Sequence, residues 1–282
     1  MGNAQPISMT GREFPMSDEN FGVISKVAYQ YTGIKLPDEK RQMIYSRIAR
    51  RIRALSLDDF DQYCALIIDD QNEEFNEFIN AITTNLTSFF RENHHFEYLE
   101  STVIPGLKKA NSDRKVRIWS AGCSTGEEPY SIAMTLLKNF GLSSGWDLKI
   151  LATDLDSNVV TTGRNGLYAA DRVSGMKPEL IEKWFNASDD GSRYEVVQRA
   201  KDLIQFNRLN LLDNWPMKNK FDIIFCRNVV IYFDKPTQKK LFDRYADQLN
   251  DGGYLIIGHS ESLNKLTDRF ESIGKTIYRK IG

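Results

Sequence analysis

The segment 118–133, IWSAGCSTGEEPYSIA, constrains the fold more than any other part of the chain. A short apolar run leads into a turn that contains Gly122 and Gly126, and an apolar-periodic helical pattern follows. Such a glycine turn lets the backbone approach a nucleotide-type ligand closely. It also suits an ordinary tight turn between a strand and a helix. Both interpretations predict a strand–turn–helix unit, the building block of a parallel sheet.

Two glutamates, Glu127 and Glu128, start the predicted helix. Carboxylates at this position offset the positive end of the helix and repel a diphosphate. They suit a ligand that carries an ammonium and a sulfonium. S-adenosylmethionine fits this description, and NAD does not.

A second buried strand is predicted over residues 148–156, LKILATDLD. Asp154 stands near its end, which is where a ribose diol is usually held in a dinucleotide-type fold. Alternatively, Asp154 or Asp156 caps a helix that begins near Asn158. The two roles can coexist.

Further along the chain, short apolar runs alternate with helical patterns. These runs cover residues 203–209, 221–226 and 254–258. The last two runs, 269–273 and 276–280, are joined only by Gly274 and Lys275, a gap too short for a crossover. The chain is therefore predicted to form an α/β fold, a doubly wound and mostly parallel sheet that ends in an antiparallel hairpin.

A ligand in such a sheet lies beyond the carboxyl ends of the strands. The residues that follow the predicted strands are Asn210, Leu211, Arg227, Asn228, Tyr232, Gly258 and His259. Asn210 could reach an adenine, but asparagine in a loop is also a common turn former.

The amino-terminal part has a different pattern. We expect a flexible tail over residues 1–17, a small all-helical domain over 18–82, a linker and helix over 83–114, and the sheet domain over 115–282. The sheet domain carries an insertion at about 167–202, where a helical stretch and the segment SDDGSRYEVVQ predict a small β-subdomain.

One predicted helix of the first domain is basic on one side. Ile44, Ile48, Ile52 and Leu55 share a face at helical spacing, and the opposite side carries Arg47, Arg50 and Arg53. A cationic helix can bind nucleic acid or an acidic protein surface, or simply face water. The formal net charge of -1 and a sequence pI near 6.4 argue against a general affinity for nucleic acid.

Composition excludes several other classes. No run approaches the ~20 apolar residues of a membrane span, and no signal peptide is evident, so we expect a cytoplasmic protein without membrane insertion. Three widely spaced cysteines, Cys64, Cys123 and Cys226, argue against a disulfide framework. His94 and His95 are adjacent, and neighbouring residues do not share a helix face. We therefore predict no metal.

Four blocks closely resemble the chemotaxis receptor methyltransferases of the CheR family. They are TNLTSFFRE at 84–92, WSAGCSTGEEPYS at 119–131, FCRNVVIYFD at 225–234 and GHSES at 258–262. The resemblance runs from about residue 18 to the carboxyl end. It implies a class I methyltransferase that transfers a methyl group from S-adenosylmethionine to glutamates on the cytoplasmic helices of membrane chemoreceptors. The products would be glutamate methyl esters and S-adenosylhomocysteine.

The resemblance also implies roles for individual residues. The residues that would bind the cofactor are Asn85, Thr87, Arg91, Gly122, Glu128, Asp154, Asn210, Leu211, Arg227 and Asn228. Glu127, beside Glu128, is a further candidate. Arg91 and Tyr232 would be catalytic, and Arg47, Arg50 and Arg53 would dock the receptor. From the residues alone, Arg91 could instead form an interdomain ion pair and Tyr232 could be a half-buried aromatic.

Some family members grip a receptor pentapeptide with a Gly-x-Gly loop in the inserted subdomain. The turn SDDGSRYE of this chain has Gly191 without a second glycine two residues away, so we do not expect that tether. Other open possibilities are a class I methyltransferase of nucleic acid or small molecules, and a non-catalytic regulator that binds S-adenosylmethionine. The motif Asn/Asp-Pro-Pro-aromatic, common in enzymes that methylate base amines, is replaced by RNVV at 227–230.

Overall fold

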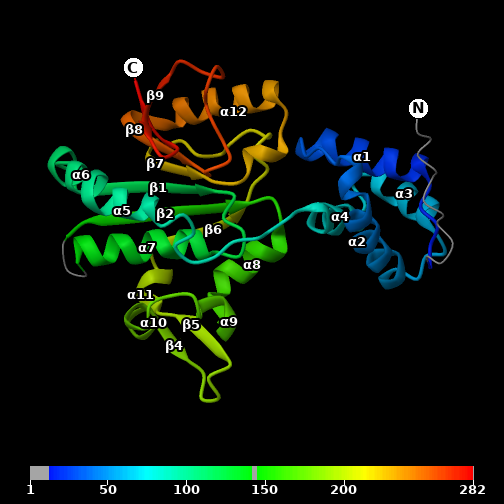
Figure 1. Ribbon diagram of the computed structural model, residues 1–282, viewed down its shortest axis with the longest axis horizontal. Helices are drawn as coiled ribbons and strands as arrows, with labels where there is room; N and C mark the ends of the chain where they lie inside the picture. The colour runs from blue at the N-terminus through cyan, green and yellow to red at the C-terminus, as the bar shows by residue number, and fades with distance from the viewer. Residues whose placement is uncertain (1–12, 142–144, 282) are drawn as a thin grey trace, which may run out of the picture. The chain divides into compact units, whose positions relative to one another are not determined.

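The computed structural model describes residues 13–141 and 145–281 (Figure 1). The predicted tail therefore falls mostly outside the described residues. The chain divides into two compact units, with the boundary after Thr83.

The described part of the first unit is entirely helical, as predicted. Its elements are α1 (Asp18–Thr32), η1 (Asp38–Lys40), α2 (Arg41–Ala54), α3 (Phe60–Ile68) and α4 (Glu73–Ile82). Ser17 starts α1 with a capping box, in which its hydroxyl and the side chain of Asn20 satisfy each other's backbone N–H groups. Gly33 ends the helix in the left-handed conformation, with φ of 70°.

The core of this unit contains the isoleucine face of α2. Ile44, Ile48 and Ile52 have no exposed surface, whereas 37% of Leu55 is exposed. Leu55, predicted to share a face with these isoleucines, is the C-cap that follows the last residue of α2, Ala54.

The second unit is built on a seven-stranded sheet in the order β6-β2-β1-β7-β8-β10-β9. The strands are β1 (Lys115–Ala121), β2 (Asp147–Asp154), β6 (Ile204–Arg208), β7 (Phe221–Cys226), β8 (Leu249–Ile257), β9 (Phe270–Gly274) and β10 (Ile277–Lys280). The first five strands in this order pair in parallel, and the β9–β10 hairpin is antiparallel. The predicted fold class is confirmed.

Helices cover both faces of this sheet (Figure 1). In β1, Ile118 packs into a core with α7 (Glu127–Phe140) and α8 (Ser157–Asn165), and Trp119 packs into a core with α12 (Lys235–Gln248). The segment before β1 adds α5 (His94–Tyr98), the π-helix η2 (Leu99–Val103) and α6 (Ile104–Ala110) to the α7 side. This alternation gives the doubly wound arrangement.

The insertion forms a second, three-stranded sheet in the order β3-β5-β4. Its elements are β3 (Leu167–Ala169), α9 (Ala170–Val173), α10 (Pro178–Trp184), β4 (Phe185–Ala187), β5 (Arg193–Val196) and α11 (Gln198–Lys201). Its strands pair antiparallel, and in Figure 1 it projects from the helical layer below the main sheet.

Strand β8 is longer than its sequence pattern indicates. It begins at Leu249, five residues before the apolar run, and its pairing with β7 shifts register between Phe221 and Ile223. Gly252, with φ of 72°, lies in this irregular section, which hides the strand from a search for apolar runs. Among the described residues, no helix is both long and apolar enough to span a membrane.

Candidate active site

The glycine turn holds the carboxyl end of β1 close to two neighbouring strands. Gly122 and Gly126 have φ of 100° and 99°, values that L side chains rarely adopt. The backbone N–H groups of Gly122 and Cys123 both donate to the Thr153 carbonyl, at 2.8 and 2.9 Å. A Cβ at Gly122 would lie 2.3 Å from Cγ2 of Val229, after β7. Only glycine allows this approach.

The two glutamates at the start of α7 have separate partners. Glu127 is fully buried and pairs with Arg172 of the insertion, while the Thr125 hydroxyl donates to it at 2.6 Å. Glu128 accepts from the Ser120 hydroxyl at 2.7 Å and from Nη1 of Arg227 at 3.1 Å. Burial raises the pKa of Glu128, and Arg227 opposes that shift.

Asp156, and not Asp154, takes the helix-capping role that the sequence left open. Asp156 is the N-cap of α8 and accepts from the backbone N–H of Asn158 at 2.9 Å. The Asp154 carboxylate accepts from the N–H groups of Ser124 at 2.8 Å and Asp156 at 3.1 Å. Burial raises the pKa of Asp154 to about 6. Asp154 therefore braces the glycine turn and does not cap the helix.

Asn85 is hydrogen-bonded to the residues that follow β1 and β2. Its side chain donates to Oδ2 of Asp156 at 2.8 Å, and its carbonyl accepts from the Ser124 hydroxyl at 3.0 Å. Thr87 is half-buried in the loop that follows, and Nη1 of Arg91 donates to the Leu86 carbonyl at 2.8 Å. The loop at 85–91 thus lies beside the ends of β1 and β2.

Arg227 links this loop to the sheet. It follows β7, is only 6% exposed and bonds Glu128, the Arg91 carbonyl and Glu92, whose Oε2 lies 3.4 Å from Nη2. Among the described residues, its Nε has no hydrogen-bond partner. The positive charge of Arg227 therefore lies between two carboxylates at the carboxyl ends of the strands.

The loop after Arg227 carries two more predicted residues. Asn228 has a left-handed backbone, with φ of 59°, and Tyr232 is half-buried at the end of η3 (Val230–Tyr232). After β6, the Asn210 side chain accepts from the Leu212 N–H at 3.1 Å and so acts as a turn former, and Leu211 is buried in the α12 core. Their contacts with a cofactor stay predictions.

Comparison with known proteins identifies the family. Residues 19–83 match the family described as CheR methyltransferase, all-alpha domain, and residues 85–279 match CheR methyltransferase, SAM binding domain. The chain belongs to the CheR methyltransferase family. A probable chemotaxis protein methyltransferase from Rhizobium etli is 44% identical over 256 residues, 89% of this chain and 96% of the relative. The chemotaxis protein methyltransferases of Salmonella typhimurium and Escherichia coli are each 40% identical, over 96% of this chain and 93% and 94% of their own lengths.

This CheR methyltransferase is therefore an S-adenosylmethionine-dependent enzyme. The donor set at the strand ends fits that cofactor. The Asp154 carboxylate stands at the end of β2, the place where folds of this type usually hold a ribose diol, and the glycine turn admits close backbone approach. When bound, the cofactor supplies an activated methyl group, and the protein supplies its orientation.

The predicted docking arginines have different surroundings. Arg47 is half-buried and donates to the carbonyls of Ala81, at 3.1 Å, and of Thr83. Arg50 and Arg53 are exposed, and Arg53 pairs with Glu13 at 3.3 Å. Because Arg47 holds the end of α4, its guanidinium already has a structural role within the first unit.

The histidines of this CheR methyltransferase are closer together than the sequence argument allowed. The rings of His94 and His95 are 4.1 Å apart, and both lie near Glu92, with one ligand atom of each residue within 4.8 Å of the others. The argument that adjacent histidines do not converge is wrong here, because the Glu92 carboxylate lies within reach of both rings, with its Oε2 3.6 Å from Nδ1 of His95. Arg227 already supplies a positive charge to Glu92, and the absence of a metal stays a prediction.

Two residues at the strand ends were missed by sequence reasoning. Glu92 bonds His259 Nδ1 at 2.8 Å, and buried Glu261 accepts four backbone N–H groups near Asn228. Both lie inside the family-like blocks, at 84–92 and 258–262, so the signal was their place in those blocks.

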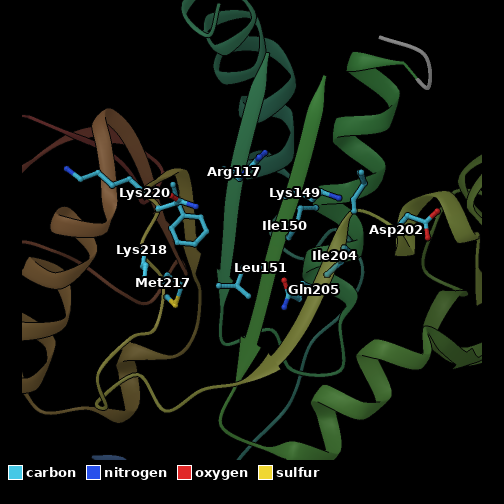
Figure 2. Close-up of a pocket in the computed structure, with 13 residues that line it drawn as sticks. Arg117, Lys149, Ile150, Leu151, Asp202, Ile204, Gln205, Met217, Lys218 and Lys220 are labelled. Carbon is cyan, nitrogen blue, oxygen red and sulfur yellow. The ribbon is translucent and has the colours of Figure 1, made fainter. Parts of the chain in front are cut away.

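A cavity of about 420 Å³ lies away from these residues, on the amino-terminal halves of β1 and β2 (Figure 2). Figure 2 shows Arg117 and Lys149 on the strands and Lys218 and Lys220 on the facing segment. Arg117 is paired with Asp147. Because ligands of such sheets bind at the opposite, carboxyl edge, this cavity is not part of the candidate active site.

Proposed function

We propose that this enzyme methylates glutamate side chains on the cytoplasmic helices of membrane chemoreceptors, forming methyl esters and S-adenosylhomocysteine for sensory adaptation. One observation carries the proposal: both units match the two CheR domains, and relatives named chemotaxis protein methyltransferases cover nearly the whole chain. An acceptor on receptor helices would also place the enzyme in the cytoplasm.

The proposed chemistry is a direct displacement at the methyl carbon. A carboxylate oxygen attacks the methyl group, the bond from that carbon to sulfur breaks, and the sulfur keeps the electron pair. A glutamate is already ionised at neutral pH, so no general base is required. Holding oxygen, carbon and sulfur in line can supply roughly 7 to 11 kcal/mol of the barrier reduction.

The positions described above support the following proposed roles for individual residues. Asp154 holds the ribose and Glu128, with Arg227, faces the methionine part. Arg91 orients the substrate carboxylate, and Tyr232 shapes the path of the methyl group, with neither exchanging a proton. In support, Arg91 belongs to the loop that Asn85 fastens beside the glycine turn.

Arg50 and Arg53 are proposed to attract the acidic receptor surface, because both are exposed on α2. Contacts of this kind are weakened by salt. Receptor methylation should therefore slow as ionic strength rises, and the double replacement Arg50→Ala with Arg53→Ala should remove most of that dependence. Lys149→Ala, in the cavity of Figure 2, is the matched control and should behave as wild type.

The decisive test is transfer of radiolabelled methyl from S-adenosylmethionine to membranes that contain chemoreceptors. Label that mild alkali releases as methanol supports glutamate esters, since N-methyl amines resist that treatment. Label on nucleic acid or a small metabolite, or alkali-stable label on protein, would refute the proposal. Arg91→Ala should abolish transfer even when S-adenosylmethionine saturates the enzyme, and unchanged single-turnover transfer would remove Arg91 from the mechanism.

A further inference from the structure

Glu261 is a buried acid to which neither the resemblance nor the chemistry above gives a role. Only 5% of it is exposed, and it follows β8 in the turn that begins at Gly258. Among the described residues, its carboxylate forms no ion pair with a side-chain cation. Burying a charge without a cation is costly unless hydrogen bonds replace the lost water.

Four backbone N–H groups provide those hydrogen bonds. Oε2 accepts from Asn228 at 2.9 Å and from Gly258 at 2.6 Å. Oε1 accepts from Val229 at 2.9 Å and from Ile231 at 3.3 Å. The carboxylate thus joins the loops that follow two adjacent strands, β7 and β8. Successive N–H groups that converge in this way form an anion-binding nest, and here the anion is a side chain of the same chain.

The loop that Glu261 holds has an uncommon backbone conformation at its start. Asn228 has φ of 59°, and its side chain lies so close to Gly258 that a Cβ there would be 2.5 Å from Nδ2. Asparagine tolerates the left-handed conformation better than most other residues, and here the hydrogen bonds around it favour that conformation. Three of the four N–H donors belong to residues 228–231, so the carboxylate imposes most of this shape.

We propose that Glu261 is a positioning residue, whose carboxylate fixes the 227–232 loop so that Arg227 meets Glu128 and Tyr232 stands at the reaction centre. Glu261 acts through these residues and does not touch the reacting atoms. The role given to Tyr232 rests on the proposed function. The role given to Arg227 requires only that the enzyme binds S-adenosylmethionine.

The test compares Glu261→Gln with wild type and with Glu271→Gln, an exposed glutamate on β9. Glutamine keeps the size of the side chain but turns an NH₂ group towards two N–H donors. We expect an increase of about tenfold or more in the Kd for S-adenosylmethionine and a similar loss of kcat, because hydrogen bonds to a charged acceptor are lost. Glu271→Gln should match wild type. Glu261→Ala, which leaves four unsatisfied donors, serves only to show how far folding depends on this acid.

Thermal unfolding separates positioning from general stability. The proposal holds if Glu261→Gln impairs binding and turnover at temperatures well below its own Tm, where the protein is folded. It is overturned if Kd and kcat stay within about twofold of wild type, or if cooling restores both. If the wild-type enzyme labels no receptor, the proposed function fails. The Kd of Glu261→Gln for S-adenosylmethionine, compared with that of wild type, then still decides the role of Glu261.

Discussion

Replacing Arg227 with methionine should destabilise the second unit by about 3 to 5 kcal/mol, because it leaves a buried carboxylate without its cation. Glu128 is 8% exposed, and its Oε2 lies 3.1 Å from Nη1 of Arg227. The pKa of Glu128 is already raised by burial, and without Arg227 it should rise further. The folded variant would then hold a proton that the unfolded chain releases. The loss of unfolding free energy caused by Arg227→Met should therefore become smaller as the pH falls.

A double-mutant cycle isolates this pair from the other partners of Arg227. Glu128→Gln combined with Arg227→Met removes both charges, and the double variant should be more stable than the sum of the single losses predicts by at least about 2 kcal/mol. The control is Lys138→Met. Lys138 pairs with Glu100 at 2.9 Å on the surface, where the side chains are 55% and 32% exposed, and its loss should cost less than about 1 kcal/mol.

The assay is urea unfolding followed by tryptophan fluorescence. The tryptophans Trp119, Trp146, Trp184 and Trp215 all belong to the second unit, so the signal reports that unit alone. With the usual urea dependence, Arg227→Met should lower the midpoint by about 1 to 2 M. A coupling energy below about 0.5 kcal/mol, or a deficit that does not change with pH, would refute the reasoning.

Gly122→Ala should weaken cofactor binding and cost about 1 to 3 kcal/mol in urea unfolding, because the new Cβ would meet Val229 at 2.3 Å; Val229→Ala in the same chain should restore part of the loss. Affinity for S-adenosylmethionine, measured by calorimetry, should fall as the pH drops through 6, where Asp154 takes up a proton, and Asp154→Asn should bind weakly without that dependence. Burial lowers the pKa of His95 from 6.5 to about 4, so the stabilisation it gives is present above pH 6.5 and is lost as the pH falls through that range. His95→Gln should make the urea midpoint less sensitive to pH there, and an unchanged dependence would contradict this role.

The fold could be predicted from the sequence because its signals are local. The glycine turn determines how one strand connects to the next helix, and the two-residue gap at Gly274 determines that the last two strands form a hairpin. Together these connections allow few topologies. Hydrogen bonds between polar groups that are far apart in the sequence could not be predicted in the same way. Nothing near Arg47 in sequence shows that its guanidinium binds carbonyls at the end of α4, and nothing near Glu261 shows which N–H groups it accepts. Periodicity also fails at element ends, as at Leu55.

The cysteines give each unit a built-in reporter of its own opening. Cys64 lies in the first unit, Cys123 and Cys226 lie in the second, and all are buried free thiols. Burial raises the pKa of Cys64 to about 11 and raises the pKa of the other two well above the usual value, so the folded protein holds them protonated and shielded. An alkylating reagent can reach each thiol only while the surrounding structure is open. The rate at which each cysteine is alkylated, followed by mass spectrometry, therefore measures how often its own unit opens under native conditions.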